Sequence, residues 1–179
     1  MKAVVLYWSK TGNTLKVAQA IVDGLTEVGS NVILLRVEDA AELDWFDYDL
    51  VCLGFPSYQW HPPKAVDDYL QSRFAFHRRD GRVKNGAPRL PGKYALVFCT
   101  YSGPHTGIDE ATPAGKYAGQ FFAHMGFAVD EWYVVGEFHG SEERSTQGPL
   151  GDIRGRPNEA DLAQIKRQAV KLAERLTAK

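Results

Sequence analysis

Apolar residues along the chain follow two different patterns, one typical of strands and one of helices. Nearly continuous apolar runs cover residues 3–8, 31–37, 50–54, 94–100 and 128–136. Helical spacing is found at 14–28, in a short stretch at 40–43, from Pro63 onward, at 114–125 and at 159–176. Strands that are apolar along their whole length are usually buried on both faces. The alternation therefore predicts an α/β fold in which helices cover both faces of a parallel sheet.

Two segments interrupt this alternation. Residues 73–92 hold six Lys or Arg residues and one Asp, and residues 137–157 are rich in Gly, Ser, Glu and Arg. Both are longer than ordinary connections, and loops of that length are often functional. The simplest interpretation of the basic segment is a solvated loop. Alternatives are a contact with an acidic redox partner, with a nicotinamide nucleotide or with another subunit.

Length and composition predict one globular domain over residues 1–179, with extended loops at about 73–92 and 137–157. The chain has 179 residues, of which 44% are hydrophobic and 24% charged. With 21 Lys and Arg against 22 Asp and Glu, the net charge is −1. This balance excludes a general nucleic-acid binder, which needs an excess of basic residues.

Neither the apolar runs nor the cysteines indicate a membrane or a metal site. No run approaches the roughly 18 residues that span a bilayer. The first run is too short for a signal peptide, so we expect a cytoplasmic protein without membrane insertion. Cys52 and Cys99 are too few for a tetrahedral thiolate site. Buried core thiols are the favoured interpretation, and a regulatory disulfide is the alternative.

The loop after the first predicted strand has the residues of a phosphate site. Its sequence is Ser9-Lys10-Thr11-Gly12-Asn13-Thr14, and a helix follows directly. Free amides at a helix N-terminus, a flexible glycine and several hydroxyls suit a phosphate monoester. The loop lacks the spacing of nucleoside-triphosphate and dinucleotide motifs. The alternative is an ordinary helix start, where Ser, Thr and Asn are common anyway.

Two further loops carry aromatic and histidine side chains after the third and fourth predicted strands. They are Gly54-Phe55-Pro56-Ser57-Tyr58-Gln59-Trp60-His61-Pro62-Pro63 and Thr100-Tyr101-Ser102-Gly103-Pro104-His105-Thr106-Gly107. Ligands of open parallel sheets bind at the carboxyl ends of the strands, where all three loops lie. Aromatic loops beside a phosphate site suit a flat, conjugated ligand with a phosphorylated tail. For Phe55 local packing is the favoured interpretation, whereas Trp60 and Tyr101 favour a ligand.

These loops resemble those of the flavodoxin family over essentially the whole chain. The resemblance implies a three-layer sandwich with a five-stranded parallel sheet in the order 2-1-3-4-5, and bound FMN. Ser9, Thr11, Gly12, Asn13 and Thr14 would hold the phosphate. Residues 57–61 and 100–103 would surround the flavin ring, with Tyr58 or Trp60 on one face and Tyr101 near the other. The predicted cofactor-binding residues are Ser9, Lys10, Thr11, Gly12, Asn13, Thr14, Pro56, Ser57, Tyr58, Gln59, Trp60, His61, Thr100, Tyr101, Ser102, Gly103 and His105.

The chain also departs from the pattern of flavodoxin electron carriers. Those proteins are strongly acidic and often have a glycine in the second flavin loop, whereas this chain is nearly neutral and residues 57–63 contain no glycine. Pro62 and Pro63 stiffen that loop, so we expect weaker stabilisation of the one-electron-reduced flavin. His61 and His105 could lie at the flavin edge and tune its potential or donate a proton, or they could be solvated.

Three functions remain open at this point. The leading prediction is an FMN-dependent electron carrier that exchanges electrons with a redox partner protein. The alternative is an FMN-dependent NAD(P)H or quinone reductase, because residues 54–58 also resemble the corresponding loop of flavodoxin-like quinone reductases. A non-catalytic binding module is the third. Since the redox chemistry belongs to the flavin, no catalytic nucleophile and no metal are expected.

Overall fold

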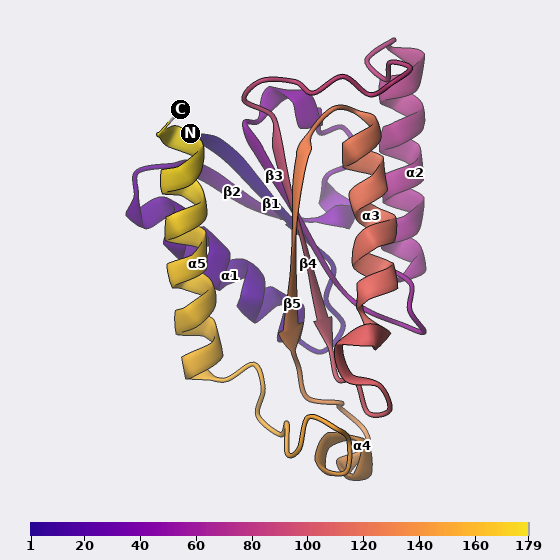
Figure 1. Ribbon diagram of the computed structural model, residues 1–179, viewed down its shortest axis with the longest axis vertical. Helices are drawn as coiled ribbons and strands as arrows, with labels where there is room; N and C mark the ends of the chain where they lie inside the picture. Colours follow the sequence, from indigo (N-terminus) through magenta and orange to yellow (C-terminus); the bar gives the residue numbers. More distant parts are fainter. Residues whose placement is uncertain (179) are drawn as a thin grey trace.

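The computed structural model describes residues 1–178 as a five-stranded sheet between two layers of helices (Figure 1). The strands are β1 (Lys2–Tyr7), β2 (Asn31–Arg36), β3 (Leu50–Pro56), β4 (Tyr94–Tyr101) and β5 (Ala128–Val135). All neighbouring pairs are parallel and the order is β2-β1-β3-β4-β5. The predicted fold class and strand order are therefore confirmed.

Helices on both faces connect the strands. They are α1 (Asn13–Glu27), α2 (Lys64–Arg79), α3 (Thr112–His124), the short α4 (Glu142–Thr146) and α5 (Glu159–Thr177). In Figure 1, α1 and α5 cover one face of the sheet and α2 and α3 cover the other. No helix among residues 1–178 is long and apolar enough to cross a membrane.

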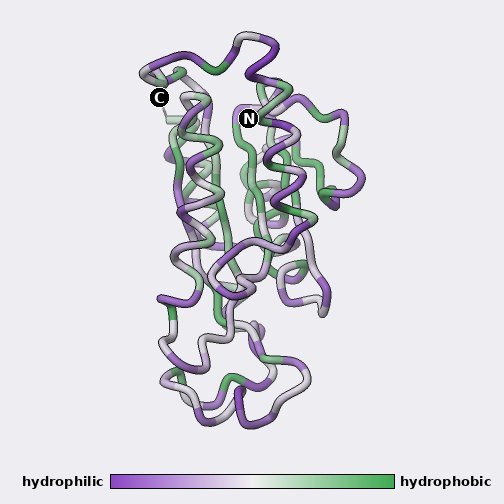
Figure 2. Tube along the Cα trace, turned by 90° about the vertical axis from the view of Figure 1, so that its right-hand side faces the viewer, coloured by the Kyte–Doolittle hydropathy of each residue, from purple (hydrophilic) through white to green (hydrophobic). Residues whose placement is uncertain are grey.

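Both faces of each central strand are buried, as the apolar runs predict. In β1, Val5 packs in the cluster with α1 and α5, whereas Val4 and Leu6 pack in the cluster with α2 and α3. All three side chains are fully buried. Apolar residues accordingly concentrate in the middle layer (Figure 2).

The structure corrects three of the predicted segments. The predicted helix at 40–43 is wrong, because these residues form a non-helical connection between the 3-10 turns at Val37–Asp39 and Trp45–Asp47. The loop predicted at 73–92 begins later, since α2 continues through Arg79. Phe74, which packs against the core, and the buried His77 continue the buried face of α2 through this stretch. The extended segment at 137–157 contains the short helix α4.

Cys52 and Cys99 are free, buried thiols on neighbouring strands. Cys52 packs on the α1 and α5 side of the sheet, and Cys99 packs on the α2 and α3 side. Burial raises the pKa of both thiols above its usual value. The prediction of core thiols is therefore confirmed and the alternative of a disulfide between them is wrong.

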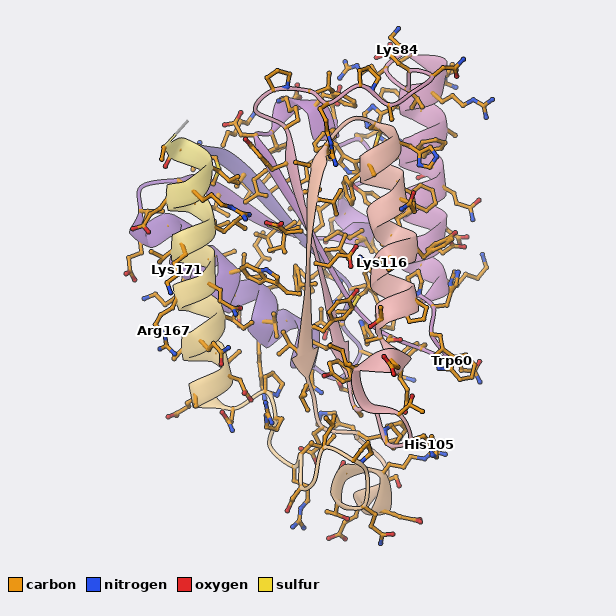
Figure 3. The ribbon with its side chains drawn as sticks, in the orientation of Figure 1. Trp60, Lys84, His105, Lys116, Arg167 and Lys171 are labelled. Atoms are coloured by element: carbon orange, nitrogen blue, oxygen red, sulfur yellow. The ribbon has the colours of Figure 1, made fainter. Side chains whose placement is uncertain are left out.

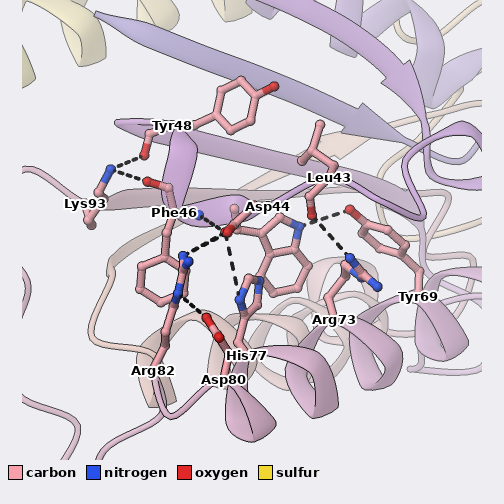
Figure 4. Close-up of polar contacts among 11 residues, drawn as sticks. Leu43, Asp44, Phe46, Tyr48, Tyr69, Arg73, His77, Asp80, Arg82 and Lys93 are labelled. Atoms are coloured by element: carbon pink, nitrogen blue, oxygen red, sulfur yellow. Dashed lines mark hydrogen bonds and ion pairs between the residues drawn. The ribbon is translucent and has the colours of Figure 1, made fainter.

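A buried histidine in the last turn of α2 lies in a polar cluster (Figure 4). His77 is 0% exposed, and neither ring nitrogen has a hydrogen-bond partner among residues 1–178. Its Nδ1 lies 3.9 Å from Asp44 Oδ1. Arg82 forms ion pairs with both Asp44, at 2.9 Å, and Asp80, at 2.7 Å. The imidazole therefore faces the carboxylate of Asp44, which already forms an ion pair with Arg82.

We predict that His77 makes the protein less stable in acid. Burial is the main cause that lowers its pKa below 6.5, and Arg82 and Arg73 add to the effect while Asp44 and Asp80 oppose it. Below about pH 6.5 the unfolded chain takes up a proton that the folded chain refuses, so stability falls by up to about 1.4 kcal/mol per pH unit. The loss continues until the lowered pKa of the folded state is reached.

The substitution His77→Phe should remove this pH dependence while preserving the packing against Trp45, Phe46 and Phe76, whose ring centroids lie 5.0 to 5.6 Å from the imidazole. Urea denaturation at about pH 7.5 and about pH 5.5 measures it. The exposed His124→Gln variant is the control. Equal losses of stability in acid for wild type and His77→Phe would contradict the prediction.

Candidate functional site

Four loops at the carboxyl ends of β1, β3, β4 and β5 surround a cleft of about 600 Å³. Parallel strands direct these ends to one edge of the sheet. Trp60 and His105 lie at this end of the molecule and Lys84 at the other (Figure 3). Lys84 of the basic segment therefore lies away from the cleft.

The loop between β1 and α1 presents an open helix N-terminus to the cleft. Gly12 precedes the helix with φ 99°, a left-handed conformation that other residues adopt only with strain. Its amide donates to Ser9 Oγ at 3.1 Å, which closes the turn. The first turn of α1 contains no acidic residue. Its amides and partial positive charge are therefore available to an anion.

Two buried side chains in the first turn of α1 join this loop to the other strands. Thr14 Oγ1 lies 2.8 Å from Thr100 Oγ1 at the end of β4. Asn13 Nδ2 donates to the Glu137 carbonyl at 3.1 Å, and its Oδ1 lies 3.4 Å from His139 Nε2. These contacts hold the loop at residues 9–14 against the walls of the cleft.

The loop after β3 forms a tight turn that exposes aromatic side chains. The backbone amides and carbonyls of Tyr58 and His61 bond each other at 2.9 and 3.1 Å. The two residues between them, Gln59 and Trp60, have φ values of 49° and 66°. Left-handed backbone costs about 1–2 kcal/mol for such residues. Trp60 is 59% exposed as a result of this conformation.

Side chains on either side of the turn fix its position. The Tyr58 ring packs edge-on against Trp8, with centroids 5.9 Å apart. The His61 ring lies against Tyr117 of α3 at 4.4 Å. Ser57 donates its amide to the Thr100 carbonyl, at 2.9 Å, which links the turn to β4.

The loop after β4 is shaped by one carboxylate. Glu110 Oε1 accepts the amides of His105 and Thr106, both at 2.7 Å. Ser102 Oγ donates to the Gly136 carbonyl at 2.8 Å, which joins the loop to the end of β5. Burial raises the pKa of Tyr101, so its phenol is protonated at neutral pH.

The structure brings most of the predicted site residues together. Those that line the cleft are Ser9, Lys10, Thr11, Asn13, Thr14, Pro56, Ser57, Tyr58, Gln59, Trp60, Thr100, Tyr101, Ser102, Gly103 and His105. Gly12 does not line the cleft; its amide closes the turn through the bond to Ser9. His61 is not part of the lining, because its ring packs on Tyr117. Whether these residues bind a cofactor stays a prediction.

Sequence reasoning missed the fourth wall. It consists of Gly136, Glu137, Phe138, His139 and Arg144, and Pro104 and Glu110 also line the cleft. A Cβ atom at Gly136 would lie 2.8 Å from Asn13 Nδ2, so only glycine allows this close approach. The available signal was the position of the long segment 137–157 after the fifth predicted strand.

A cleft at the carboxyl edge of a parallel sheet, beside an open helix N-terminus, is the place where α/β proteins commonly bind phosphorylated ligands. A family model described as a flavodoxin domain matches residues 4–100, more than half of the chain. The chain therefore belongs to the flavodoxin family, and this match supports a flavodoxin-type function.

Relatives include a reductase and a carrier. An NAD(P)H dehydrogenase (quinone) from Archaeoglobus fulgidus is 27% identical, with 97% of this chain and 96% of that protein covered. A flavodoxin from Clostridium beijerinckii is also 27% identical, with 54% and 62% covered. Among solved structures, a flavodoxin from the domain Archaea has a TM-score of 0.66 at 18% identity, with 99% of both chains covered. The structural likeness shows the fold.

We predict that Asn13→Ala loosens the fourth wall of the cleft. The variant leaves the Glu137 carbonyl without its buried donor, which costs about 1–3 kcal/mol. Hydrogen exchange should become faster at residues 137–139, and urea denaturation should show the lost stability. Gln19→Ala, on the exposed face of the same helix, is the control. Unchanged exchange at 137–139 in Asn13→Ala would disprove the role of this contact.

Proposed function

We propose that this protein binds FMN non-covalently and transfers electrons as a flavodoxin-type carrier. The observation that carries the proposal is the open N-terminus of α1 at one side of a cleft lined by Tyr58, Trp60 and Tyr101. FMN combines the two groups that such a cleft suits, a phosphate ester and a flat conjugated ring. The flavodoxin domain match and the similarity to a Clostridium flavodoxin support it.

Each part of the cofactor has a matching part of the cleft. In the proposal the amides and hydroxyls of residues 9–14 hold the phosphate, and residues 56–60 and 100–103 and His105 surround the ring. Gly12 supports the phosphate turn, and His61 acts through the packing of its loop. When bound, the flavin supplies the electron or hydride chemistry.

The protein residues orient the ring and exclude water from it. The turn at residues 58–61 is already shaped by its own hydrogen bonds and by the contacts with Trp8 and Tyr117. A preformed aromatic wall reduces the ordering cost of binding. Electrons would pass to a redox partner protein in the cytoplasm.

A second candidate is an FMN-dependent NAD(P)H or quinone reductase. The relative named for that activity covers nearly the whole chain, unlike the Clostridium flavodoxin. The stiff loop ending in Pro62 and Pro63, both buried, and the wall from segment 137–157 would then shape a substrate site above the flavin.

Trp60→Leu should weaken FMN binding about fivefold, because stacking of an aromatic side chain contributes about 1 kcal/mol beyond its burial. Quenching of flavin fluorescence during titration of flavin-free protein measures the dissociation constant. Ile33→Ala removes an exposed apolar side chain on the distant strand β2 and is the control. Absence of saturable FMN binding to the wild type would refute the proposal and favour a non-catalytic module.

Anaerobic mixing of the FMN-loaded protein with NADH or NADPH separates the two candidates. A carrier should keep its flavin absorbance on the timescale of turnover until a reductase protein is added. A reductase should lose this absorbance with the nucleotide alone and regain it on addition of a quinone. If neither the nucleotide alone nor an added reductase protein reduces the flavin, the flavin is inert and electron transfer is contradicted.

A further inference from the structure

The charged side chains that line the cleft differ in whether they already have hydrogen-bond or ion-pair partners. Both lining carboxylates already accept backbone amides, Glu110 from His105 and Thr106, and Glu137 from Gly155 at 2.9 Å. The lining cations Lys10 and Arg144 form no ion pair within residues 1–178. Lys10 and Arg144 are therefore the charged lining groups that can meet an anion without breaking an existing ion pair.

Arg144 differs from the other arginines of segment 137–157. Arg154 pairs with Glu142 and Asp152, at 2.9 and 2.6 Å. Arg156 pairs with Asp161 at 2.6 Å. Arg144 is the arginine of this segment that lines the cleft, and its guanidinium remains unpaired there.

The ring of Phe138 supports Arg144 on the fourth wall of the cleft. Its guanidinium carbon lies 4.8 Å from the centroid of the Phe138 ring. Phe138 is fixed in turn by the buried Ser145, whose Oγ accepts the Phe138 amide at 3.1 Å and donates to its carbonyl at 3.3 Å. The neighbouring residues Glu137 and His139 contact Asn13 at the start of α1. The wall that carries Arg144 is thus attached to the predicted phosphate site.

We propose that Arg144, supported by Phe138, is a phosphate-recognition residue of this cleft. An unpaired guanidinium presents several donors in a plane and binds phosphate oxygens in pairs. The phosphate belongs either to FMN or to a second nucleotide that reacts with the flavin. The identity of the nucleotide rests on the proposed function, whereas recognition of phosphate by Arg144 does not.

Titration of the flavin-free full-length protein with inorganic phosphate tests recognition directly. In ¹⁵N NMR spectra, the Arg144 Nε–H signal should shift saturably. The amides of residues 11–14 should follow with the same dissociation constant if Arg144 shares the phosphate of FMN, and with a different one if it binds the phosphate of a second nucleotide. Arg144→Gln should weaken phosphate binding about tenfold, as expected for loss of a charge-assisted contact, and Arg144→Lys about threefold. The paired Arg154→Gln should bind like the wild type. Wild-type affinity in Arg144→Gln, or no shift of Arg144, would overturn the proposal.

Flavin and nucleotide titrations then identify the source of the phosphate. If it belongs to FMN, Arg144→Gln should weaken FMN binding about tenfold and leave riboflavin binding unchanged. If it belongs to a second nucleotide, FMN affinity should stay constant while KM for NADH or NADPH rises and kcat is retained. Arg154→Gln is the control in both arms. Loss of neither affinity would contradict the proposal, and failure of the wild type to bind FMN would refute the proposed function while the phosphate titration still decides the role of Arg144.

Discussion

The structure of the cleft depends on the unfilled hydrogen-bonding capacity at the start of α1. A helix leaves its first amides without partners inside the helix. Here Gly12 has no side chain to cap them, and its own amide is used by Ser9. Asn13 and Thr14 could cap a helix, but they are buried and bond other segments. The same residues therefore leave the helix end open and attach it to β4 and to the loop after β5.

The near-neutral net charge conceals an uneven distribution of charge along the chain. Residues 73–93 hold seven of the 21 Lys and Arg residues and one of the 22 Asp and Glu residues. The remainder of the chain therefore has an excess of acidic residues, as expected for a flavodoxin. Lys84 marks the position of the basic segment, at the end of the molecule opposite Trp60 and His105 (Figure 3). Part of this basic segment is neutralised by acidic residues from outside it, as in the Arg82–Asp44 ion pair, and net charge alone describes neither part of the chain.

Periodicity in the sequence predicts the sheet well because buried parallel strands must be apolar on both faces. The limits of α2 and the fourth wall were harder to predict for different reasons. Arg78 and Arg79 suggest a solvated loop, yet His77, which directly precedes them and is 0% exposed, continues the buried face of the helix. The contact between Asn13 and Glu137 joins residues 124 positions apart, which no local pattern indicates. Hydroxyl-rich and aromatic loops have recognisable compositions, whereas the mixed wall of Gly136, Glu137, Phe138, His139 and Arg144 has none.

The strained turn at Gln59 and Trp60 shows how the fold prepares a binding surface before a ligand arrives. Glycine and asparagine are the residues that usually occupy two successive left-handed positions in a hairpin turn. Two larger side chains persist there because the turn is held at both ends, by the Tyr58–His61 backbone bonds and by the link from Ser57 to Thr100. The fold thereby meets the conformational cost of exposing Trp60 when the protein folds. A ligand that stacks on this ring does not have to meet that cost again. Trp60, the most exposed of the large hydrophobic side chains in the described chain, is thereby kept at the cleft.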